Sequence, residues 1–190
     1  MRFSLFDNIL EGKRLNQLIL IFISSFIIMN LIVNYAFTIS GYPVSFMESQ
    51  LSFSGELIKS HFSVMTNNQI ELYFYAQIVD YVYIFVYSCL IFVIGIYLER
   101  RFQKRTLLGT SGYVVALSGI VAGICDASEN VFIILMINNH TSFPNIYAII
   151  HSCFALLKFI LLGCIILWII LLFAIIIIRK LKLISNNSKK

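Results

Sequence analysis

Four charged residues interrupt long apolar stretches of this sequence and are the first candidates for chemistry. They are Asp80, Asp126, Glu129 and Lys158. A charge inside an apolar helix is costly, so such residues usually face the interior of a helix bundle and mark a functional site. Asp126, Glu129 and Asn130 are three and four residues apart, a spacing that brings side chains together on a helix surface. Carboxylates, an amide and an amine on neighbouring helices can bind a cation, carry a proton or act as general acid and base.

The composition shows what kind of element must hold these charges. Of 190 residues, 59% are hydrophobic and only 12% are charged, and the mean hydropathy is +0.89. A soluble domain is about 45–50% apolar and about 25% charged, and a domain of this length still leaves roughly 30% of its surface in water. A soluble core cannot absorb this much apolar surface, whereas a bilayer can. We predict an integral membrane protein in which residues 1–190 form a single membrane domain.

Four stretches are long and apolar enough to cross a bilayer, which requires about 20 residues. They cover approximately residues 18–39, 73–98, 107–137 and 146–178. The predicted fold is therefore all-α, a four-helix transmembrane bundle. The last two stretches are longer than a bilayer needs, so they should tilt or project into water. The polar tail, residues 185–190, is predicted to be disordered.

Lysine and arginine are distributed unevenly around these stretches. With four spans, 12 of the 14 basic residues fall on one side, in groups before the first stretch, between the second and third, and after the last. The positive-inside rule places this side, and with it both termini, in the cytoplasm. The basic groups match the anionic lipid of the inner leaflet. Because they are short and separate, they do not indicate nucleic-acid binding.

The segment between the first two stretches, residues 40–72, is the only sizeable part predicted to lie outside the membrane. Apolar residues recur there at helical spacing, at Leu51, Ile58, Phe62 and Met65. Ser54 is a plausible helix start. We predict one amphipathic helix in this outer loop, lying on the membrane surface and covering the bundle. Asn68 and Glu71 have the spacing of a capping box that would start the helix leading into the second span.

Polar residues in all four stretches fall at a similar depth. Counted at 1.5 Å per residue from the outer ends, they lie in the outer half of the bilayer. The set is Asn34 in the first stretch, Gln77 and Asp80 in the second, Asp126, Glu129 and Asn130 in the third, and His151 and Lys158 in the fourth. Within each stretch they keep to one helix face. We predict that they meet in one polar cavity near the outer leaflet.

Small residues lead along the third stretch to this polar group. Gly112, Gly119 and Gly123 lie on the same helix face as Asp126. Small residues allow membrane helices to approach closely. We therefore assign the three glycines to helix packing.

The predicted cavity holds more negative than positive charge. Lys158 can pair with one carboxylate, which offsets part of the desolvation cost, and a pair with Asp126 is equally consistent with a purely structural role. The other carboxylates need a proton, a cation, water or His151. Burial beside a second carboxylate disfavours the charged form. We expect at least one carboxyl group to be protonated at neutral pH, or a bound cation to complete the site.

Three short patterns together resemble a group of small, uncharacterised four-span membrane proteins of prokaryotes. They are Gln77-x-x-Asp80-Tyr81-x-Tyr83-x-x-x-Tyr87 in the second stretch, Asp126-x-x-Glu129-Asn130 in the third, and Lys158 midway along the last. The resemblance covers most of the chain from the outer loop onward. It implies a four-helix membrane fold and no particular activity.

Three classes of function are consistent with these residues. The first is a binding or transport protein whose cavity takes a small cationic or protonatable ligand, or protons, at Asp80, Asp126 and Glu129. The second is a membrane-embedded enzyme that modifies a lipid, with Asp126 or Glu129 as general acid or base. The third is a structural or partner protein in which the charges fix helix register. Four spans without a repeat are few for alternating access, so transport would require a homo-oligomer.

Several familiar chemistries lack their sequence signature. The four cysteines all lie inside predicted spans and form no C-x-x-C pair, which argues against zinc and against quinone-linked disulfide chemistry. There is no phosphate-binding loop, dinucleotide fingerprint or H-E-x-x-H motif. We predict neither a metal nor a cofactor, and we expect the partners to be the lipid bilayer itself and a lipid or small molecule.

Overall fold

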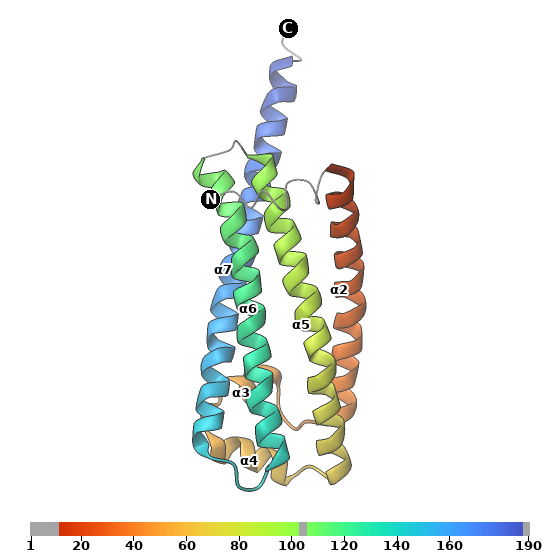
Figure 1. Cartoon of the computed structure of the whole chain (residues 1–190), viewed down its shortest axis with the longest axis vertical. Helices are drawn as coiled ribbons and strands as arrows, with labels where there is room; N and C mark the ends of the chain where they lie inside the picture. Colours follow the sequence, from red (N-terminus) through yellow and green to blue (C-terminus); the bar gives the residue numbers. More distant parts are fainter. Residues whose placement is uncertain (1–11, 103–105, 188–190) are drawn as a thin grey trace.

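The computed structural model describes residues 12–102 and 106–187, and these residues form helices joined by short loops, with no strand among them. The long helices are α2 (Gly12–Ser40), α5 (Asn67–Arg101), α6 (Leu107–Asn138) and α7 (Asn145–Asn187). Two short helices, α3 (Phe46–Gln50) and α4 (Gly55–Ser63), connect α2 to α5 at one end of the bundle (Figure 1). The predicted all-α four-helix bundle is confirmed.

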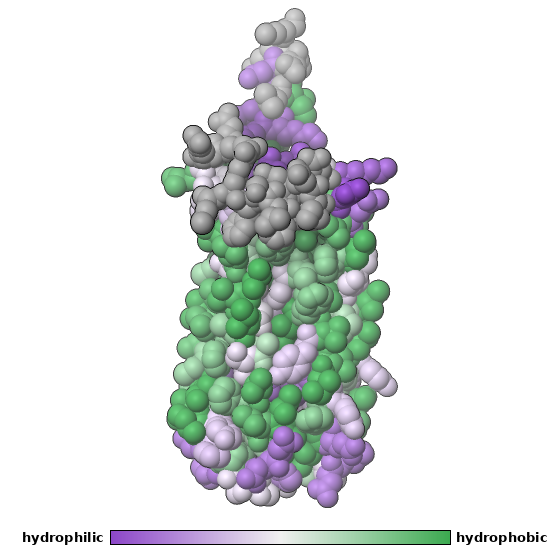
Figure 2. Space-filling view, in the orientation of Figure 1, coloured by the Kyte–Doolittle hydropathy of each residue, from purple (hydrophilic) through white to green (hydrophobic). Residues whose placement is uncertain are grey.

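All four long helices are long and apolar enough to cross a membrane. Figure 2 shows a broad apolar belt around the middle of the bundle, with polar residues gathered at the end where α4 lies. Large apolar side chains face outward along this belt, such as Leu31 at 67% and Leu167 at 71% exposure. Outward apolar side chains are favourable in lipid and unfavourable in water. The chain is a multi-pass membrane protein.

The helices extend beyond the apolar stretches at several ends. At 1.5 Å per residue, α7 is roughly 64 Å long, about twice the hydrocarbon thickness of a bilayer. Its last turns project past the other helices (Figure 1). The tail predicted to be disordered from Ser185 is helical as far as Asn187, because α7 simply continues. Residues 188–190 lie outside the described part of the chain.

The start of α5 corrects one prediction. The capping box is formed by Thr66 and Gln69, not by Asn68 and Glu71: the Gln69 N–H donates to Thr66 Oγ1 at 3.3 Å, and the Thr66 N–H donates to Gln69 Oε1 at 2.9 Å. The residues that flank this capping box determine where α5 begins. Met65 and Ile70 lie at the two positions of a hydrophobic staple and are both buried in one apolar cluster.

The α4 helix closes the loop end of the bundle. Its N-cap is Ser54, as predicted, whose Oγ accepts a hydrogen bond from the Leu57 N–H at 3.3 Å. Its inner face buries Ile58 and Phe62 almost completely, against α6 side chains such as Ile133 and against Phe143 in the α6–α7 turn. The shorter α3 lies beside it and was not predicted, because its five residues are too few to show a periodicity.

A tyrosine between α2 and α3 forms hydrogen bonds with both short helices of the loop. The hydroxyl of Tyr42 accepts a hydrogen bond from Ser49 Oγ at 3.0 Å and lies 3.3 Å from His61 Nδ1 in α4. Burial raises the pKa of Tyr42 to about 12, and burial lowers the pKa of His61. Both groups are therefore neutral at pH 7, and the tyrosine hydroxyl and the histidine ring form a neutral hydrogen bond.

The long helices pack in series, α2 along α5, α5 along α6 and α6 along α7. The α5–α6 contact is the closest, because glycines remove the side chains between the two backbones. A Cβ on Gly95 would lie 2.6 Å from the backbone nitrogen of Ala116, and one on Gly112 would lie 2.5 Å from that of Glu99. Gly119 and Gly123 face side chains of α5 in the same way. By contrast, α2 is not packed along α7.

Candidate functional site

A cavity of about 630 Å³ lies between the long helices, beneath α3. Its volume is within the range of about 300–1,000 Å³ usual for small-molecule sites. All the polar residues selected from the sequence line it: Asn34, Gln77, Asp80, Asp126, Glu129, Asn130, His151 and Lys158. The structure therefore brings these residues together, from four different helices. That they serve a function remains a prediction.

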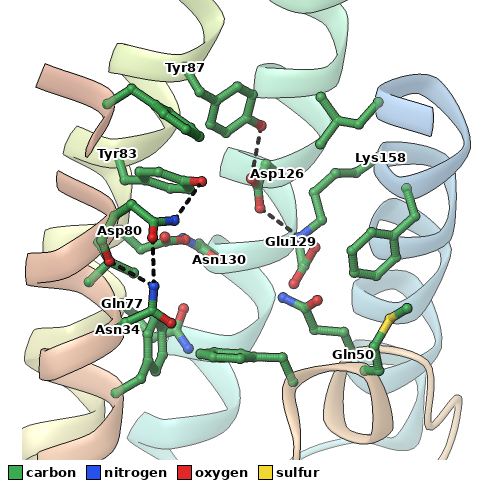
Figure 3. A pocket seen from close by; sticks show the side chains of 18 of the residues that line it. Asn34, Gln50, Gln77, Asp80, Tyr83, Tyr87, Asp126, Glu129, Asn130 and Lys158 are labelled. Carbon is green, nitrogen blue, oxygen red and sulfur yellow. Dashed lines mark hydrogen bonds and ion pairs between the residues drawn. The ribbon is translucent and has the colours of Figure 1, made fainter. Parts of the chain in front are cut away.

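Lys158 is the cation that pairs with the carboxylates of the cavity wall. Its Nζ lies 2.8 Å from Asp126 Oδ1 and 2.5 Å from Glu129 Oε2, so one ammonium group pairs with two carboxylates (Figure 3). All three side chains are almost fully buried. Asp126 and Glu129 are one helical turn apart on α6, which is why a single lysine on α7 reaches both. The sequence predicted that Lys158 pairs with one carboxylate, and the structure shows two.

Asp126 has a further partner on α5. The hydroxyl of Tyr87 donates to Asp126 Oδ2 at 2.8 Å, so both oxygens of this carboxylate are engaged. A buried ion pair is stabilised only when its remaining polar atoms are also hydrogen-bonded. Tyr87 meets this requirement for Asp126.

Asp80 is held differently from the other two carboxylates. Its Oδ2 accepts a hydrogen bond from Asn130 Nδ2 at 2.8 Å. No lysine, arginine or histidine of the described residues lies within ion-pair distance of it. Figure 3 shows Asp80 across the cavity from Lys158, on the side of α2 and α5. A carboxylate that faces a cavity without a cationic partner is an available binding group.

The α2 side of the cavity is polar as well. Asn34 Nδ2 donates to the Asn30 carbonyl oxygen at 2.7 Å, and Asn30 Nδ2 donates to the Tyr83 hydroxyl at 3.3 Å. The bond from Asn30 to Tyr83 connects α2 to α5, and the bond from Asn34 lies within α2. The two amides therefore fix the wall that faces the acidic group.

His151 contributes a polar atom whose hydrogen-bonding capacity is unused. Its Nδ1 lies 3.4 Å from the backbone carbonyl oxygen of Glu129, and a carbonyl oxygen can only accept, so Nδ1 carries the proton. The other ring nitrogen, Nε2, is then an acceptor. It is buried and has no hydrogen-bond partner within residues 12–102 and 106–187. His151 itself is 2% exposed.

Sequence reasoning missed several lining residues. Tyr87 lies seven residues, or two helical turns, after Asp80 and therefore on the same face, which could have identified it. Tyr81, next to Asp80 in the sequence, does not line the cavity and donates its hydroxyl to the Ala127 carbonyl oxygen at 3.2 Å. Gln50, in α3, points into the cavity (Figure 3). No pattern in the loop sequence indicates Gln50, because its position depends on how α3 folds over the bundle.

The described residues hold no group of three or more histidine, cysteine, aspartate or glutamate side chains arranged to hold a metal ion. The carboxylates of the cavity instead contact Lys158, Tyr87 and Asn130. Fold and cavity together define a four-helix membrane bundle with an acidic internal site. No known protein family, no curated protein and no solved structure matches this chain.

Proposed function

We propose that the protein binds a small cationic or protonatable ligand in its internal cavity, with Asp80 as the carboxylate that receives the positive charge. The observation that carries this proposal is that the three carboxylates differ in their partners. Lys158 pairs with Asp126 and Glu129, whereas Asp80 has only the amide of Asn130. A cation beside Asp80 would offset part of the excess negative charge of the cavity.

The surroundings of Asp80 favour such a ligand over water alone. Charge interactions are strengthened where water is scarce, because the effective dielectric constant is low. The amide of Asn130 holds the carboxylate in place, so little reorganisation is needed on binding. Tyr83, which also lines the cavity, stacks on Phe26 at a centroid distance of 5.5 Å and adds an aromatic wall. Aromatic faces attract cations as well.

The alternative of a lipid-modifying enzyme has less support. It would use Asp126 or Glu129 as general acid or base, which requires a carboxyl group free to exchange a proton with a substrate. Both groups are instead ion-paired with Lys158, and Tyr87 occupies the second oxygen of Asp126. The same pairing supports a structural role for this part of the cluster.

We further propose that both termini lie in the cytoplasm, so that the cavity lies nearer the outer leaflet. The proposal rests on the basic residues that flank the helices on the side opposite α4. Proton or ligand transport would, in this arrangement, need a second copy of the chain, because a single bundle has no repeat to alternate.

The test uses butylammonium as the probe and the full chain in phosphatidylcholine nanodiscs. Asp80→Asn should weaken butylammonium binding about 10-fold or more, because a hydrogen bond to a charged group contributes about 1.5–3 kcal/mol. The measurement is the dissociation constant by equilibrium binding of the labelled amine. Glu71→Gln is the matched control, since Glu71 is an exposed carboxylate on the same helix. Equal affinity in wild type and Asp80→Asn would rule out the proposed role of Asp80.

A further inference from the structure

The cavity has two chemically different halves. Toward α3 it is lined by the polar groups around Asp80 and Lys158. Away from α3 it continues between α5 and α7, where the lining is entirely apolar: Leu90, Ile91, Ile94, Leu162, Ile166 and Ile169. From Lys158 to Ile169 the apolar lining extends about 16 Å along α7. A small hydrophilic ion would fill only the first half.

The polar half is closed toward the loop end. Tyr42, Ser49 and Gln50 line it there, beneath α3. Phe46 of α3 packs its ring against that of Phe37 on α2, at a centroid distance of 4.6 Å, and α3 also contacts α7. A ligand that enters from the aqueous phase would have to displace this loop.

The side of the cavity between α2 and α7 is open. These two helices are the ends of the packing series and are not packed along each other. Ile166 of α7 lines the apolar half and is still 55% exposed to the surroundings of the bundle, and Asn34 of α2, which lines the polar half, is exposed as well. In a membrane these surroundings are lipid chains. The open side therefore connects the cavity to the bilayer interior.

Two acceptor atoms of the cavity have unused hydrogen-bonding capacity. Asp80 has a carboxylate oxygen beyond the one bonded to Asn130, and His151 has its buried, unpartnered Nε2. Leaving such an acceptor unpaired costs about 1–3 kcal/mol. A ligand head that carries donors and positive charge satisfies these groups. A phosphate or carboxylate head would meet three carboxylates and be repelled.

We propose that the occupant is a single-chain amphiphile whose head is an ammonium group with N–H donors and which enters from the membrane between α2 and α7. This proposal rests on the proposed function and specifies the ligand class. The head lies beside Asp80 and the chain lies in the apolar half. We assign one chain to this half, because its apolar lining comes from only two facing helices, α5 and α7.

The experiment compares butylammonium with dodecylammonium in phosphatidylcholine nanodiscs, with partition into empty nanodiscs subtracted. Leu162→Trp fills the apolar half from α7. It should weaken dodecylammonium binding at least 10-fold and leave butylammonium binding within about twofold, since the short probe does not reach that half. Leu167→Trp is the matched control, because Leu167 is 71% exposed and does not line the cavity. It should change neither affinity.

Two further arms keep the result interpretable. Ile166→Trp, at the exposed edge of the cavity, should reproduce the selective loss with little effect on folding. Dodecyltrimethylammonium has the same chain and charge as dodecylammonium but no N–H group, and it should bind wild type at least 10-fold more weakly.

The outcomes separate the two proposals. If butylammonium binds and both tryptophan variants bind dodecylammonium as wild type does, the chain is not in the cavity and the amphiphile is ruled out, while the proposed function stands. If the two dodecyl heads bind equally, the donor requirement is wrong. If neither amine binds wild type, the proposed function itself fails.

Discussion

Lys158 is the residue on which the buried charges depend. Its ammonium group pairs with two carboxylates one turn apart, and Tyr87 engages the remaining oxygen of Asp126. Removing one member of such a group leaves a buried charge without compensation, which costs more than the group contributes when intact. The stability of the bundle and the charge of the cavity are therefore linked through one side chain.

At this scale we predict that Lys158→Met destabilises the folded protein by about 3–5 kcal/mol, because it leaves Asp126 and Glu129 buried and unpaired. Adding Asp126→Asn and Glu129→Gln should restore most of the loss, since neutral groups of the same shape need no counter-charge. The free energy of unfolding, measured in mixed micelles, gives both values.

The control is Lys59→Met, because Lys59 forms an ion pair with Glu56 at 3.0 Å on the exposed face of α4. This substitution should change the free energy of unfolding by less than about 1 kcal/mol. A Lys158→Met protein as stable as the control would show that the buried pairing contributes nothing.

The polar residues of the cavity could be predicted from the sequence, because charged and amide side chains in apolar membrane helices face the bundle interior rather than lipid. Their individual partners could not. Whether Lys158 reaches Asp126, Glu129 or both depends on side-chain rotamers and on the offset between α6 and α7, which periodicity does not define. Gln50 is beyond prediction for a different reason, since it comes from a loop helix of five residues.

The α5–α6 pair is the most closely packed element of the bundle. Gly95 and Gly112 allow the two backbones to meet at the end away from α3 and α4, and Gly119 and Gly123 continue the contact toward Asp126. The close approach sets the height of Asp80 relative to Asn130, which hydrogen-bond across the same interface. The packing stripe therefore positions the polar group as well as the helices.

We predict that Gly95→Ala lowers the free energy of unfolding by about 1–3 kcal/mol, the usual cost of inserting atoms into a well-packed interface. The new Cβ would meet the backbone of Ala116, which cannot move aside as a side chain can. Gly163→Ala is the control on α7, where a Cβ meets nothing within 4 Å. It should be neutral or slightly stabilising. Equal effects of the two substitutions would mean that the glycine contact is not close in the membrane.

The long helices were predictable because an apolar stretch of this length can only be a helix in lipid. Their ends were less so. Thr66-x-x-Gln69 and Asn68-x-x-Glu71 have the same capping spacing, and the choice between them is made by the burial of Met65 and Ile70 in the tertiary structure. The α3 helix escaped prediction because a single turn has no hydrophobic period.

At the scale of the whole molecule, the two ends of the bundle differ in charge. The acidic cavity lies near the α4 end of the bundle, and the basic residues Arg100, Arg101, Arg179 and Lys180 are placed at the other end. This separation of charge along the bundle is the physical basis for the proposed orientation.

We predict that Asn68→Cys, at the α4 end, reacts with a membrane-impermeant maleimide on intact cells, and that Lys182→Cys reacts only after permeabilisation. Both variants carry alanine in place of the native cysteines, because Cys153 and Cys164 are exposed on α7. Labelling is read as a mass shift of the purified protein. The reverse pattern would place the cavity near the inner leaflet.

The order of the helices in space could not be derived from the sequence. Four apolar stretches are compatible with a closed ring, in which the first and last helices meet. The structure leaves α2 packed on α5 alone among the long helices, and most of its large apolar side chains face outward. Lipid solvates such a surface as well as a neighbouring helix does, so hydrophobicity alone does not close the ring.

The gap between the first and last long helices has a consequence for how the protein responds to its host. The cavity lies beside this gap, so in the proposed binding mode acyl chains of the surrounding bilayer would border the ligand. If the proposed amphiphile binds there, lipid unsaturation, sterol content and bilayer thickness should each change its measured affinity. Affinities measured in detergent and in membranes of different lipid composition should therefore differ from one another.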